Sequence, residues 1–174
     1  MGAPVPASPE LIAAALAQGG ELVRVSLIKC LSSPHKPTAE QASRTLKRIA
    51  EADRDILYPF RKQLLKAAFA ARDIRVQWNL SLVLGRIPLT GQDKAVAVDL
   101  MYERLTDRSG LNRTCAMEAL MDLSISDPAL RARILPILRE ALEHGTPAMK
   151  ARAKLLLKPL HRTEQLGTKQ SRTK

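Results

Sequence analysis

One apolar pattern recurs four times along this chain of 174 residues and constrains its fold more than any other feature. Within each copy, positions at offsets 0, 4, 7 and 8 are predominantly apolar, which places them on one side of an α-helix. The copies begin at Ala42, Val76, Asn112 and Met149, so successive starts lie 34, 36 and 37 residues apart. This spacing is typical of one helical hairpin per repeat. We therefore expect an all-α solenoid in which one helix of each hairpin carries this pattern.

Capping residues and helix breakers mark the remaining helices. Ser, Thr and Asp accept hydrogen bonds from the free N–H groups at a helix start, and Pro is tolerated in the first turn. The expected starts are at Ser8, Thr38, Asp73, Asp93, Asp127 and Thr146. A helix over residues 9–18 precedes the first hairpin and would cap the open end of the stack. We expect a flexible N-terminus at 1–8, a single repeat domain at 9–162 and a basic, disordered tail at 163–174.

Two stretches of the sequence carry a family resemblance. The segment from Asp73 to Ile87, DIRVQWNLSLVLGRI, resembles the second helix of a HEAT repeat, as does the segment 27–34 running into 41–50. Over residues 20–160 the chain thus resembles HEAT-like, armadillo-type helical repeat proteins. The resemblance implies a right-handed α-solenoid of about four HEAT-like hairpins with an N-terminal capping helix. HEAT repeats share a shape across many functions, so the resemblance does not identify a ligand.

The sequence lacks the residue patterns that enzymes and metal sites require. His35, His144 and His161 have no cysteine or paired carboxylates at ligand spacing, so we expect no metal site. The chain has no Gly-rich phosphate loop, nucleophile elbow or Walker-type Lys. We therefore predict a protein without a catalytic residue or cofactor.

One enzymatic resemblance needs a separate comparison. Bacterial DNA alkylation-repair glycosylases are built from HEAT-like repeats with a basic concave face, aromatic residues and a catalytic Asp. In this chain the residues one and two turns after Trp78, the single Trp, are Leu82 and Arg86 rather than an acid. A HEAT-like DNA glycosylase is therefore the last of the alternatives that we consider.

The two cysteines and the N-terminus bear on the compartment. Cys30 and Cys115 both occupy apolar positions of expected helices, which favours buried, reduced thiols over a disulfide. The first residues contain no charged stretch followed by an apolar run, as a secretory signal would. We expect a cytoplasmic protein that does not interact with a membrane.

The net charge of +11 favours an acidic partner, but the charge is uneven along the chain. Basic residues are in excess over 38–72 and 127–174, whereas the middle is close to neutral. Offsets 2, 6 and 9 of each repeat point away from the apolar side and are expected to form the concave surface. The predicted partner-binding residues on this surface are Arg44, Arg48, Trp78, Leu82, Glu118, Met121, Leu155 and Lys158.

Because this row has basic ends and a partly apolar centre, we predict a non-enzymatic scaffold or adaptor that binds another protein. Trp78 either anchors that partner, as interface tryptophans do, or packs between neighbouring helices. The alternative is a nucleic-acid-binding protein with basic patches at Arg44–Arg48, including Lys47, and at Lys150–Lys158, including Lys154. Self-association through the apolar part of the groove is a further possibility.

Overall fold

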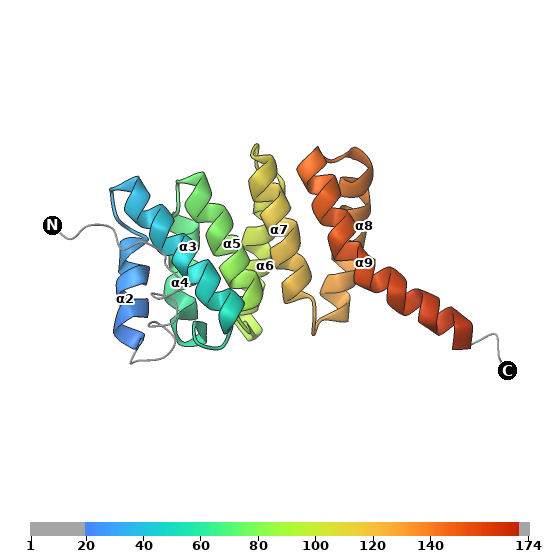
Figure 1. The fold of residues 1–174 in the computed structure, drawn as a ribbon, viewed down its shortest axis with the longest axis horizontal. Helices are drawn as coiled ribbons and strands as arrows, with labels where there is room; N and C mark the ends of the chain where they lie inside the picture. The colour runs from blue at the N-terminus through green and yellow to red at the C-terminus, as the bar shows by residue number, and fades with distance from the viewer. Residues whose placement is uncertain (1–19, 171–174) are drawn as a thin grey trace.

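A computed structural model describes residues 20–170 of the chain, with side chains as far as residue 158. The regular structure of this part is entirely helical and contains no strand, which confirms the all-α prediction there. The elements are α2 (Glu21–Cys30), α3 (Lys36–Ala52), η1 (Tyr58–Phe60), α4 (Arg61–Ala70), α5 (Ile74–Arg86), α6 (Gly91–Leu105), α7 (Gly110–Leu123), α8 (Pro128–His144) and α9 (Pro147–Gln170) (Figure 1). The expected N-terminal segments 1–8 and 9–18 lie outside the described residues.

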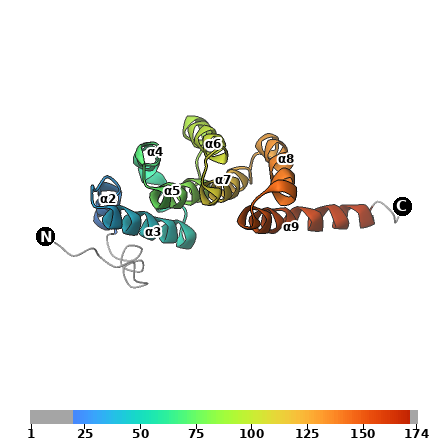
Figure 2. The same ribbon diagram turned by 90° about the horizontal axis from the view of Figure 1, so that it is seen from above.

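The helices alternate between two layers. Figure 2 shows α3, α5, α7 and α9 in one layer and α4, α6 and α8 in the other. Helices that follow each other in the first layer are in contact: α3 with α5, α5 with α7, and α7 with α9. The middle of this layer is set back relative to its ends, so its outer side is concave (Figure 2). We call this outer side of α3, α5, α7 and α9 the second-helix face.

Side-chain caps fix several helix starts where the sequence predicted them. Asp73 accepts hydrogen bonds from the backbone N–H groups of Arg75 and Val76 at 2.8 and 3.3 Å, and so begins α5. Asp127 accepts from Leu130 N at 2.9 Å and begins α8 in the same way.

Two of the expected starts were wrong. Helix α6 begins at Gly91, two residues before Asp93, because the Asp93 carboxylate forms an ion pair with Arg61 at 2.7 Å instead of capping the helix. Helix α3 begins at Lys36, so Thr38 lies in its first turn rather than before it.

The recurring apolar positions form the core between the layers. Leu46, Leu80, Ala116 and Ala153 occupy the same offset in the four copies, and all are fully buried. Asn112, the polar exception, is also buried, and its amide donates to Gln77 Oε1 at 2.7 Å and to Asp107 Oδ2 at 3.1 Å. Asn112 thus joins its hairpin to the preceding one by a hydrogen bond to Gln77, at a position that is apolar in the other three copies.

Most of the polar contacts between hairpins repeat the spacing of the apolar pattern. These contacts join residues 32 to 36 positions apart, so that each hairpin is held to the next by similar contacts. Examples are Arg61–Asp93, Lys94–Asp127, Glu40–Arg75 and Ser43–Asn79. The domain boundary predicted at residue 162 falls within α9 and stays a prediction.

Candidate interaction surface

A chain of alternating charges crosses the second-helix face, with one residue from each of its helices. Arg86 of α5 lies 3.6 Å from Glu51 of α3 and 2.9 Å from Glu118 of α7. The second carboxylate oxygen of Glu118, Oε2, lies 3.0 Å from Nη1 of Arg152 in α9. We call Glu51, Arg86, Glu118 and Arg152 the charge ladder. It links the four helices in the order in which they stack.

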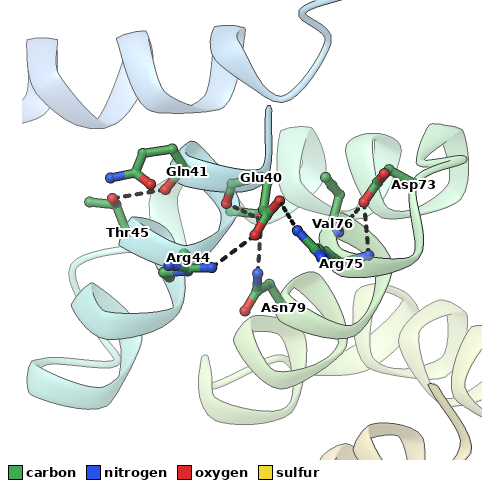
Figure 3. Close-up of polar contacts among 9 residues, drawn as sticks. Glu40, Gln41, Arg44, Thr45, Asp73, Arg75, Val76 and Asn79 are labelled. Carbon is green, nitrogen blue, oxygen red and sulfur yellow. Dashed lines mark hydrogen bonds and ion pairs between the residues drawn. The ribbon is translucent and has the colours of Figure 1, made fainter. Parts of the chain in front are cut away.

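A second ion-pair cluster lies on the same face, toward the other end of α3 and α5 (Figure 3). Glu40 of α3 contacts Arg44 one turn along its own helix at 2.8 Å, and Arg75 of α5 also at 2.8 Å. Beneath it, the buried amide of Asn79 donates to Ser43 Oγ at 3.0 Å. This cluster connects the first two hairpins by both charged and neutral contacts.

Lys47 contacts Glu51 at 3.1 Å, in addition to Arg86. Each of three carboxylates on this face, those of Glu40, Glu51 and Glu118, is therefore shared by two basic side chains. The contacts therefore leave more positive than negative charge on the face. The expected partner-binding residues Arg44 and Arg48 are exposed on α3, and Lys158 is exposed on α9. The basic ends predicted for the surface are thus accessible in the structure.

The apolar centre predicted for the surface is only partly accessible. Leu82 is 6% exposed, so the prediction that it is exposed on this surface is wrong. Because α5 contacts both α3 and α7, a position that faces outward on an isolated helix is covered by the neighbouring helices. Met121 is half-buried, whereas Leu155 on α9 is 60% exposed.

Trp78 is half-buried, which places it between the two arrangements that the sequence left open. Its indole Nε1 is buried and has no hydrogen-bond acceptor within the described part of the chain. Glu118 is only 9% exposed and serves chiefly as the acid of the charge ladder.

The residues predicted for nucleic-acid binding separate into two groups. Lys47 is half-buried and engaged with Glu51, whereas Lys150 and Lys154 are exposed on α9. The structure therefore leaves the α9 lysines, and not Lys47, as the accessible part of this set.

A cavity of about 540 Å³ opens at the edge of the face, near the C-terminal ends of α3, α5 and α7. Its charged lining consists of Glu51, Arg54, Arg86, Glu118 and Asp122, and the exposed Ile125 lies at the same edge. Burial raises the pKa of the Asp122 carboxyl; nearby Arg86 and Arg152 oppose this shift and Glu118 adds to it. The cavity is thus lined by charges of both signs.

Among the side chains that the structure describes, no group of three or more His, Cys, Asp or Glu could hold a metal ion. Cys115 is buried, and burial raises the pKa of its thiol to about 11, so the nucleophilic thiolate is disfavoured. Between residues 20 and 170 no helix is both long and apolar enough to cross a membrane.

Comparison of the sequence with family models, with curated proteins and with solved structures gives no match in any of the three. The residues and geometry of the chain therefore carry the functional argument.

Sequence reasoning did not predict the ion pairs on this face, although a signal for them was present. Acid and base alternate at Glu51, Arg86, Glu118 and Arg152, with intervals of 35, 32 and 34 residues. Opposite charges separated by one repeat are expected to meet when the hairpins stack. The outward-facing offsets alone did not reveal them, because the pairs are staggered along neighbouring helices.

Proposed function

We propose that the chain is a right-handed α-solenoid of four HEAT-like hairpins with an N-terminal capping helix. The order of helix contacts and the separation of 32 to 36 residues between polar partners support this architecture. In such a solenoid each hairpin contacts only its neighbours, and the stack presents an extended concave surface.

The proposed function is that of a non-enzymatic scaffold or adaptor that binds another protein through the second-helix face. The observation that carries this proposal is the exposure of Leu155 on α9, one turn from Arg152 on that face, where Met121 of α7 and Trp78 of α5 are half-buried. We take Leu155 as part of an apolar patch that a partner would cover, with the basic side chains at its rim, because apolar patches rimmed by polar residues are typical of interaction sites. The two free thiols are compatible with action in the cytoplasm, which we propose as its location.

Affinity capture from a native lysate tests the proposal with a matched pair of variants. Leu155→Glu places a charge on the second-helix face, whereas Phe69→Glu places one at a 54% exposed apolar position on α4, in the opposite layer. We expect a protein that is captured by the wild-type chain and by Phe69→Glu but lost with Leu155→Glu. Equal capture by both variants, or equal loss, would show that the face does not bind the partner.

Nucleic-acid binding is the second candidate, favoured by the exposed Lys150, Lys154 and Lys158 on the last helix. Binding to phosphates through lysines releases counterions, so affinity for duplex DNA or RNA would fall steeply with salt. The absence of a gel shift at low salt would exclude this candidate. Self-association is tested separately by measuring the molar mass of the chain with light scattering.

A further inference from the structure

Exposed basic side chains lie at both ends of the second-helix face. At one end Arg44, Arg48 and Arg75 are exposed, and Arg44 and Arg75 share the single carboxylate of Glu40. At the other end Lys154 and Lys158 are exposed on α9. We call these residues the α3/α5 basic end and the α9 basic end.

The centre between the two ends differs from them, because its charges are of both signs and most of them are paired with one another. Here α7 contributes Glu118, which is occupied by Arg86 and Arg152, and Asp122, which has no ion pair among the described residues. Glu51 and Arg54 add one charge of each sign at the edge cavity. Since the ladder residues already pair with one another, a neutral stretch of a partner would leave these ion pairs intact.

We propose that the face recognises an acidic polypeptide segment whose carboxylates form two clusters separated by a neutral stretch. The inference rests on the proposed function and specifies the chemistry of its partner. The clusters bind the α3/α5 and α9 basic ends, and the neutral stretch crosses α7. Complementary charges of this kind orient a partner and speed its association.

The uneven charge of the face favours a polypeptide over a nucleic acid. A nucleic acid carries a phosphate at every nucleotide, so its binding surface repeats Lys or Arg at successive steps. A polypeptide can place acidic side chains at the ends and omit them in the middle. With neighbouring helices about 8–10 Å apart, the span from α3 to α9 is roughly 25–30 Å, the length of about eight extended residues.

Fluorescence anisotropy with two labelled peptides tests the charge pattern. The split peptide has two blocks of about three glutamates separated by about four Gly and Ser residues, and the block peptide has the same composition with all glutamates adjacent. A duplex DNA of similar charge is the third probe. All three are titrated with the full chain at about 0.15 M salt, at which long-range attraction is largely screened.

Three double variants assign the contacts. Arg44→Glu with Arg48→Glu reverses the α3/α5 basic end, and Lys154→Glu with Lys158→Glu reverses the α9 basic end. Lys62→Glu with Lys66→Glu makes the same change in charge at exposed positions of α4, in the opposite layer. Circular dichroism verifies the helical content. Arg44→Gln with Arg48→Gln repeats the test with a smaller change if charge reversal unfolds the chain.

We expect the split peptide to bind more tightly than the block peptide, by about threefold or more, and each reversed end to raise its Kd by about tenfold. The α4 variant should change Kd by less than about twofold. Equal binding of the two peptides, equal weakening by the α4 variant, or tighter binding of the duplex would each overturn the inference. If neither peptide binds while Leu155→Glu still abolishes protein capture, the inference fails but the proposed function stands.

Discussion

Arg86 Nη2 lies 2.9 Å from Glu118 Oε1, and this ion pair joins α5 to α7 at the centre of the second-helix face. Glu118 also holds Arg152, so a single carboxylate of low exposure neutralises bases on both neighbouring helices. Removal of one partner from a poorly solvated pair leaves the other charges uncompensated. The stacking of the last three hairpins is therefore expected to depend on Glu118.

Glu118→Gln keeps the shape of the side chain and removes its charge. We expect the free energy of unfolding, measured with urea, to fall by about 1–3 kcal/mol. Glu51→Gln is the matched control, since Glu51 belongs to the same ladder but is exposed, and it should cost less than about 1 kcal/mol. Equal losses for the two variants would contradict this role of Glu118.

Gly85 allows α5 and α7 to approach each other closely. A Cβ at this position would lie 2.6 Å from Ala119 Cα, which is backbone and cannot move without the helix. We expect Gly85→Ala to lower the free energy of unfolding by about 1–3 kcal/mol, although Ala is the better helix former. At Gly110 a Cβ would have no neighbour nearer than 3.5 Å, so Gly110→Ala should be neutral or slightly stabilising. A stabilising Gly85→Ala would show that the helices are farther apart.

Asp122 is expected to weaken the fold near neutral pH. Burial raises the pKa of its carboxyl above the ordinary value of 3.8, so the folded chain carries the cost of a buried charge whenever Asp122 is ionised. That cost is fully present above the folded-state pKa and is relieved as the pH falls through it toward 3.8.

Asp122→Asn should therefore unfold at a higher urea concentration than the wild-type chain at about pH 7, with a difference that shrinks near about pH 4. Asp99→Asn, at an exposed position of α6, changes charge equally and should have little effect on stability. A lower stability of Asp122→Asn at neutral pH would contradict this expectation, because it would mean that the ionised carboxylate of Asp122 stabilises the folded chain.

Arg104 of α6 is buried and connects three helices. Its guanidinium donates to Ala68 O of α4 at 2.7 Å, to Gln77 O of α5 at 2.8 Å and to Ser81 Oγ, and burial lowers its pKa to about 10. Arg104→Met would remove these three hydrogen bonds from a buried setting, so we expect thermal unfolding to show a free energy of unfolding lower by about 2–4 kcal/mol. Arg108→Met, at an exposed loop position, should change stability by less than about 0.5 kcal/mol.

The apolar repeat predicted the helices and the core well, because burial at positions such as Leu80 and Ala116 depends mainly on the helix period. Asp73 and Asp127 were predictable as caps for a similar reason, since the capping hydrogen bond is local. Asp93 was not, because a long-range ion pair with Arg61 competes for its carboxylate.

The surface was harder to predict because it depends on how closely the helices pack. Leu82 faces outward on an isolated helix, yet neighbouring helices cover it. The close approach at Gly85 and Ala119 is not visible in the periodicity of either helix alone. Glu118 was selected as a partner contact, but its low exposure and two arginine neighbours make it an internal link of the face.

Photo-crosslinking in the native host tests most directly whether a partner protein binds the second-helix face. A photoreactive amino acid at position 48 or 155 samples the face, and the same amino acid at position 62 or 69 samples α4 in the opposite layer; all four positions are exposed. We expect one protein adduct that forms from 48 and 155 but not from 62 or 69, and that resists nuclease treatment. Adducts of equal yield from both layers, or adducts removed by nuclease, would contradict the binding of a protein on this face.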